Sequence, residues 1–154
     1  MNPANSNSSR AASGPGSDAG AVSEGTVSLA RIDRLRNSMP GKYFIIDELI
    51  ELFVSDLPRR LGAMADAIER ADTPALALQA HALRGSAANF GAARLDELCG
   101  RLEELGARAA LAQAPAIFDA LERESALVRD ALLALMSKDA GKPAAAPTLS
   151  RRSV

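Results

Sequence analysis

The sequence predicts an all-α protein, an antiparallel up-down bundle of four helices with a short extra N-terminal helix and disordered tails. Three observations support this fold class. The chain is 47% hydrophobic but only 3% aromatic, and its abundant Ala and Leu favour helix over strand. Apolar residues recur at helical spacing through the middle of the chain, and no segment alternates convincingly as a strand does. A length of 154 residues is enough for one domain with a hydrophobic core.

Both ends of the chain differ in composition from its middle. Residues 1–26 are rich in Ser, Asn, Ala, Gly and Pro, and residues 139–154 are similarly poor in large apolar side chains. Such segments bury too little surface to offset the entropy lost on ordering. We therefore predict two disordered tails around one folded domain at residues 27–138.

The first predicted helix is short and begins after Ser28, a suitable N-cap. Pro40 and Gly41 end it. We expect this helix to pack across one end of the bundle. The residues that it places on one side are Leu29, Ile32 and Leu35.

The second predicted helix is long and runs from residue 44 to about 71. Pro58 lies inside it, where proline removes a backbone donor and crowds the preceding turn. Because the apolar stripe keeps one phase across Pro58, we predict one kinked helix rather than two. The stripe consists of Ile46, Leu49, Ile50, Phe53, Leu57, Leu61, Met64 and Ile68.

The third predicted helix opens with the capping sequence Asp72-Thr73-Pro74 and stops at Gly91. Its core stripe is Leu76, Ala80, Leu83, Ala87 and Phe90. A fourth helix starts near Ala92, ends near Gly106, and buries Leu95, Leu98, Cys99, Leu102 and Leu105. A last helix from about Pro115 to Met136 buries Ile117, Phe118, Leu121, Val128, Leu132 and Leu135. Short connections between such helices favour the up-down order.

His81 is the only histidine, and on the third helix it points away from the core stripe toward solvent. Its neighbours on that side are uncharged, whereas a solvated helix face normally carries Glu, Lys and Arg. Gly85, one turn later, costs about 1 kcal/mol relative to Ala in an exposed helix, so its missing side chain indicates clearance for a partner. A neutral imidazole is a good nucleophile near neutral pH and forms a phosphoramidate at phosphorus.

The sequence from His81 onward carries a longer motif at fixed spacing. Its members are His81, Leu83, Arg84, Gly85, Ser86, Phe90, Gly91, Ala92, Leu95, Cys99, Leu102 and Glu103. Over about residues 29–136 the chain resembles the histidine-containing phosphotransfer (HPt) domain family. The resemblance implies a phosphorelay carrier that accepts phosphate on His81 from a receiver-domain aspartate, or from a hybrid kinase, and donates it to a response regulator. The receiver supplies Mg²⁺, so we predict no cofactor and no metal site in this chain.

The resemblance also assigns roles to two charged residues. Glu103 is expected to bind the ring nitrogen of His81 that is not phosphorylated; otherwise it is one more acid in a charged run. The Arg84 cation, three residues after His81, is able to stabilise a phosphorylated ring, although the family more often has Lys here. As a simpler alternative, Arg84 is a solvated surface residue. Cys99 is interpreted as a small core hydrophobe.

The predicted partner-binding residues surround His81 and are mostly small and uncharged. They are Ala77, Leu78, Ala82, Gly85, Ser86, Ala88 and Asn89. We expect them to contact receiver domains of a hybrid sensor kinase, a response regulator or both, with the chain itself a monomer.

Composition excludes several other classes of function. A net charge of −1 with interspersed signs does not indicate a nucleic-acid partner. No apolar stretch approaches the roughly 20 residues of a bilayer span, and no signal peptide is evident, so we predict no membrane contact and a cytoplasmic location. One Cys and one His argue against a disulfide and against a metal- or haem-binding bundle. Two alternatives stay open: a helical adaptor that binds a receiver or kinase without transfer, and a generic bundle with an ordinary surface histidine.

Overall fold

The computed structural model describes residues 25–38 and 44–139, with side chains up to residue 136. These residues form α1 (Leu29–Ser38), α2 (Phe44–Glu69), α3 (Thr73–Asn89), α4 (Ala93–Ala107), the 3-10 helix η1 (Leu111–Gln113) and α5 (Ala114–Asp139). They contain no strand, so the predicted all-α fold is confirmed over the described residues. Most of both predicted tails, and the predicted stop at Pro40 and Gly41, lie outside them.

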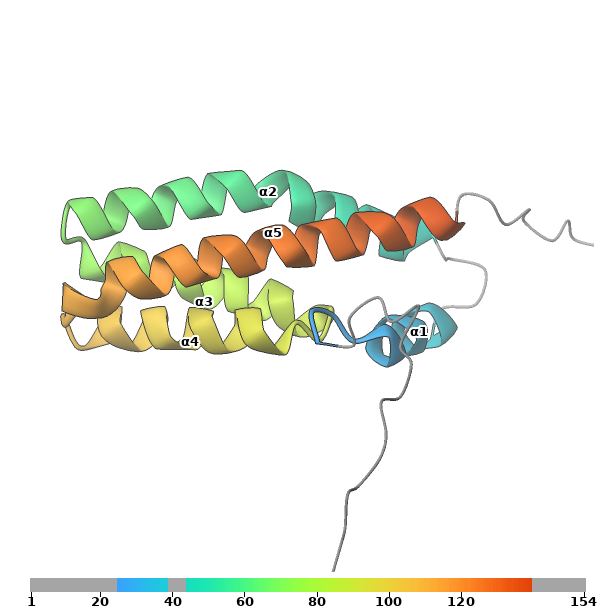
Figure 1. The fold of residues 1–154 in the computed structure, drawn as a ribbon, viewed down its shortest axis with the longest axis horizontal. Coiled ribbons are helices and arrows are strands. Elements are labelled where there is room, and N and C mark those ends of the chain that lie inside the picture. Colours follow the sequence, from blue (N-terminus) through green and yellow to red (C-terminus); the bar gives the residue numbers. More distant parts are fainter. Residues whose placement is uncertain (1–24, 39–43, 140–154) are drawn as a thin grey trace, which may run out of the picture.

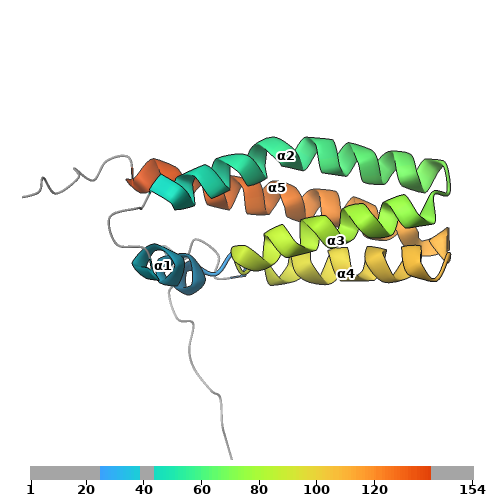
Figure 2. The ribbon, with the colours of Figure 1, turned by 180° about the vertical axis from the view of Figure 1, so that it is seen from behind.

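The four long helices α2, α3, α4 and α5 lie side by side and make the body of the molecule (Figure 1, Figure 2). α2 packs on α3, α3 on α4, α4 on α5, and α5 on α2, so the four helices enclose one core. Short connections join consecutive helices at alternating ends (Figure 1), and helices adjacent in sequence therefore run in opposite directions. α1 lies at the end of this bundle where α3 leads into α4 (Figure 2).

The turn between α3 and α4 holds the segment that enters α1. Gly91 has a φ of +63°, and a side chain there would place its Cβ 2.5 Å from Cβ of Ser28. The Ser28 amide donates to the carbonyl oxygen of Phe90 at 3.0 Å. Gly91 thus ends α3, as predicted, and leaves room for the approaching chain. Thr26, which precedes this segment, is buried at 8% exposure.

α2 continues as one helix through Pro58, as predicted, and bends near its middle (Figure 2). Pro58 is exposed and lies inside this helix, and proline inside a helix is a common cause of such a bend. Leu49 is 37% exposed, and its predicted place in the core is wrong. Leu49 lies about 100° around the helix from Ile50, which already fills the core position. The buried members of the stripe are Ile46, Ile50, Phe53, Leu57 and Met64.

The predicted core stripes of the other long helices are buried, with the exception of Leu105. They comprise Leu76, Ala80, Leu83, Ala87 and Phe90 before the turn, Leu95, Leu98, Cys99 and Leu102 in α4, and Ile117, Phe118, Leu121, Val128, Leu132 and Leu135 in α5. The Phe53 and Phe90 rings meet edge to face, with centroids 5.4 Å apart. This contact joins α2 to the end of α3. Leu105 is only partly buried and packs on the edge of the core.

α3 and α4 approach closely at Gly106, which is buried. A Cβ at this position would lie 2.8 Å from the Thr73 carbonyl oxygen and 3.0 Å from Cβ of Ala77. Because the nearest of these atoms belongs to the backbone, any larger residue would push the two helices apart. Gly106 therefore serves helix packing, and α4 ends one residue later, at Ala107.

Ala71 lies in the connection between α2 and α3 and has a φ of +54°. Left-handed backbone costs a residue with a Cβ roughly 1–2 kcal/mol, whereas glycine adopts it freely. Ala71→Gly is therefore expected to raise the free energy of unfolding by about 1 kcal/mol, measured by urea denaturation. Ala65→Gly, at an exposed site inside α2, is the matched control and should lower it by a similar amount. A loss of stability in both variants would contradict the prediction.

Candidate functional site

His81 lies near the middle of α3, on the side that faces away from the core. Two nearby residues on the core side, Ala80 and Leu83, are 0% and 1% exposed. The His81 side chain, by contrast, is 73% exposed. The outward direction predicted from helical periodicity is confirmed.

The His81 ring is held through one nitrogen only. Its Nδ1 lies 2.9 Å from Oε1 of Glu103, across the interface between α3 and α4. The hydrogen bond from His81, and then that from Arg84, hold the pKa of Glu103 below its usual range, so Glu103 is a carboxylate that only accepts. The ring therefore donates from Nδ1, and in its neutral form it keeps a lone pair on Nε2. Within the described residues, Nε2 has no hydrogen-bond partner.

Arg84 does not extend freely into solvent but lies against α4. Its Nε donates to Oδ1 of Asp96 at 3.2 Å, and its Nη1 donates to Oε2 of Glu103 at 3.4 Å. Hydrogen bonds to Asp96 and to Glu103 raise the pKa of Arg84 above its usual value. His81, Glu103, Arg84 and Asp96 thus form one chain of contacts, and neither sequence interpretation of Arg84 included its contact with Asp96.

Two members of this arrangement were missed from sequence. They are Asp96 and Gly100, which are not among the motif positions that the sequence pattern singles out. A Cβ at Gly100 would lie 3.6 Å from Cζ of Arg84, so the guanidinium rests over this glycine. The spacing of Asp96, Gly100 and Glu103 (i, i+4, i+7) places them on one face of α4, and this signal was available in the sequence.

The surface around His81 is largely as open as predicted. Leu78 is 65% exposed, and a Cβ at Gly85 would meet nothing within 4 Å. Asn89 is exposed, and Ala82 and Ala88 are half-buried. Among the described residues, Gly85 therefore has no packing contact that requires glycine.

Two of the predicted partner-binding residues are less accessible to a protein partner than the sequence suggests. Ala77 is half-buried, and its Cβ lies close to Gly106 on α4, so it belongs to the helix interface rather than to an open surface. The Ser86 hydroxyl donates to the carbonyl oxygen of Ala82 at 3.3 Å. This back-bonding is common for serine within a helix and occupies the hydroxyl hydrogen.

Other chemistry has little support in the described ranges. Burial raises the pKa of the Cys99 thiol to about 12, so this cysteine is not a nucleophile at neutral pH. Among residues 25–38 and 44–139 no group of three or more His, Cys, Asp or Glu side chains is placed to hold a metal ion. None of the helices described there is long and apolar enough to cross a membrane.

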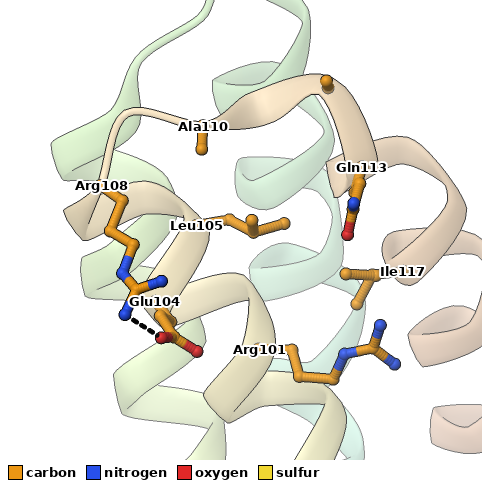
Figure 3. Close-up of a pocket in the computed structure, with 8 residues that line it drawn as sticks. Arg101, Glu104, Leu105, Arg108, Ala110, Gln113 and Ile117 are labelled. Atoms are coloured by element: carbon orange, nitrogen blue, oxygen red, sulfur yellow. Dashed lines mark ion pairs between the residues drawn. The ribbon is translucent and has the colours of Figure 1, made fainter.

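A surface pocket of about 380 Å³ opens elsewhere, between the end of α4, η1 and the start of α5 (Figure 3). Arg108 pairs there with Glu104 at 2.8 Å. Leu105 and Ile117 form the apolar side of the pocket (Figure 3). The residues that line this pocket include no histidine and no cysteine.

Comparisons with known proteins agree with this geometry. The sequence model of the Hpt domain family matches residues 48–137, which cover most of α2 and the helices that follow. The structure is similar to the crystal structure of histidine-containing phosphotransfer protein B (HptB) from Pseudomonas aeruginosa PAO1, with a TM-score of 0.68 and 31% identity. That match covers 75% of this chain and 98% of HptB. A comparison with curated proteins gives no match. The family match over more than half of the chain, with the exposed His81 inside it, shows that this protein belongs to the Hpt domain family.

Proposed function

We propose that this chain is a phosphorelay carrier that accepts a phosphoryl group on Nε2 of His81 from a receiver aspartate and passes it to another receiver. The observation that supports this most strongly is the state of the ring. Its Nδ1 is fixed by Glu103 at 2.9 Å, while the side chain is 73% exposed. A nucleophile with one nitrogen oriented and the other accessible is what transfer between two proteins requires.

The proposed step balances without a cofactor from this chain. The Nε2 lone pair attacks phosphorus of the aspartyl phosphate, the P–O bond to the aspartate breaks, and the aspartate leaves as a carboxylate. The ring keeps its Nδ1 proton and becomes positively charged as the N–P bond forms. Glu103 faces that proton, so its negative charge stabilises the charge that develops on the ring. Transfer onward is the reverse sequence with a second receiver.

Partner contact is proposed for the docking surface, which we define as Leu78, His81, Ala82, Gly85, Ala88 and Asn89. Exposed apolar area beside a nucleophile suits a protein partner, and Gly85 leaves the approach clear. We further propose that the receiver holds the Mg²⁺ that neutralises phosphate charge, since phosphoryl transfer relies mainly on positioning and electrostatics. A cytoplasmic, monomeric carrier is consistent with these proposals.

The proposal is tested by incubating the purified chain with a panel of phosphorylated receiver domains. At least one receiver is expected to transfer its label, and the label on the chain should be acid-labile and base-stable, as a phosphoramidate is. Peptide mapping should place it on His81, the only histidine in the sequence. Label in an acid-stable linkage, or no transfer from any receiver, would argue against a carrier.

A further inference from the structure

The chain of contacts that begins at His81 continues beyond Glu103 to a residue that the proposed function does not yet use. We propose that Asp96 is a positioning residue for transfer at His81: it holds Arg84, and Arg84 holds the Glu103 carboxylate in the orientation that binds Nδ1. The inference rests on the proposed function, because it concerns the same ring.

Glu103 divides its two oxygens between two partners. Oε1 accepts from His81 at 2.9 Å, and Oε2 accepts from Arg84 at 3.4 Å. A carboxylate held at one oxygen still rotates about its last side-chain bond, which is broad and soft. A second contact at Oε2 restricts that rotation and keeps Oε1 toward the ring.

Arg84 in turn depends on Asp96. Its contact with Glu103 is long for a hydrogen bond, whereas its Nε lies 3.2 Å from Oδ1 of Asp96. The Arg84 side chain is 47% exposed, so a single weak contact competes poorly with the entropy of a long, mobile side chain. Asp96 supplies the second anchor, with the guanidinium lying over Gly100 between the two acids.

Loss of Asp96 has a specific expected consequence at His81. With Arg84 released, the Glu103 carboxylate rotates more freely and holds the Nδ1 proton for less of the time. The neutral ring then populates both tautomers, and the fraction with a free lone pair on Nε2 falls. Outer partners of this kind commonly change activity by about 10-fold or more, and for an exposed contact we expect a transfer rate lower by roughly 3- to 10-fold.

The test compares Asp96→Asn with Glu97→Gln in the full chain. Both variants remove one acid from the same turn of α4, but Glu97 pairs with Arg94 at 2.7 Å, outside the chain of contacts. Because the protein has a single histidine, its ¹⁵N spectrum reports the tautomer of His81 alone. Spectra are recorded at about pH 8, where an ordinary imidazole is neutral. Transfer rates are measured with a phosphorylated receiver.

Asp96→Asn is expected to reduce both the Nδ1-protonated fraction of His81 and the transfer rate, with the midpoint of thermal unfolding nearly unchanged. Glu97→Gln is expected to change none of these three quantities. A wild-type tautomer ratio in Asp96→Asn would overturn the proposal, and so would an altered ratio with a wild-type transfer rate. If no receiver phosphorylates even the wild-type chain, the proposed function fails and the proposal falls with it. The spectra then still show separately whether Asp96 orients the ring.

Discussion

Replacing His81 with glutamine is expected to abolish phosphorylation of the chain while leaving its fold and its binding to receivers intact. Glutamine is polar and similar in reach to histidine, but its amide nitrogen has no available lone pair for attack on phosphorus. The side chain is 73% exposed, so the free energy of unfolding should change by less than about 0.5 kcal/mol. Label transfer from a phosphorylated receiver measures the loss, and titration calorimetry with the same receiver measures binding.

This variant also separates the carrier from a non-transferring adaptor. An adaptor uses the same surface without a covalent step, so it would support the same signalling output with His81→Gln as with the wild-type chain. A carrier loses that output even though its complex with the receiver persists. Residual label on His81→Gln would show that another residue accepts phosphate, and would contradict the assignment of His81.

The sequence predicted the all-helical fold and the outward position of His81 because both depend on helical periodicity. The buried stripe through Leu76, Ala80 and Leu83 places His81 on the opposite side of the same helix, whatever the rest of the bundle does. Leu49 shows the limit of this reasoning. An apolar residue at the edge of a stripe is buried only if a neighbouring helix covers it, and periodicity does not say where the neighbour ends.

The contacts of Arg84 could not be predicted in the same way, because they cross between two helices. They depend on how far α3 is shifted along α4, and that shift is set by the Gly91 turn and by the close approach at Gly106. The periodicity within one helix does not predict how far that helix is shifted along its neighbour. The contact between His81 and Glu103 was expected only through resemblance to the HPt family. Asp96 had no counterpart among the motif positions that carried the resemblance, and it was therefore missed.

The second large effect is expected at Gly85. We predict that Gly85→Leu lowers the rate of phosphoryl transfer from a receiver by roughly 100-fold or more. A Cβ at this position meets nothing in the chain, so the added side chain projects into the space that an incoming receiver must occupy. Displacing the reacting atoms by about 1 Å is enough for a loss of that size. Stability should not fall, since replacing glycine in an exposed helix gains up to about 1 kcal/mol.

The control for Gly85→Leu is a donor that needs no docking. Phosphoramidate, a small molecule, should phosphorylate His81 in Gly85→Leu about as fast as in the wild type, because Nε2 stays accessible to small reagents. Ala134→Leu places the same leucine side chain at an exposed site on α5, which packs on α2 and α4, and should leave receiver transfer unchanged. If Gly85→Leu accepts phosphate from the receiver at the wild-type rate, the partner does not approach over this turn of α3. If phosphoramidate also fails, the leucine obstructs the ring itself, and the loss says nothing about docking. Only a loss confined to the protein donor therefore places the receiver on the docking surface.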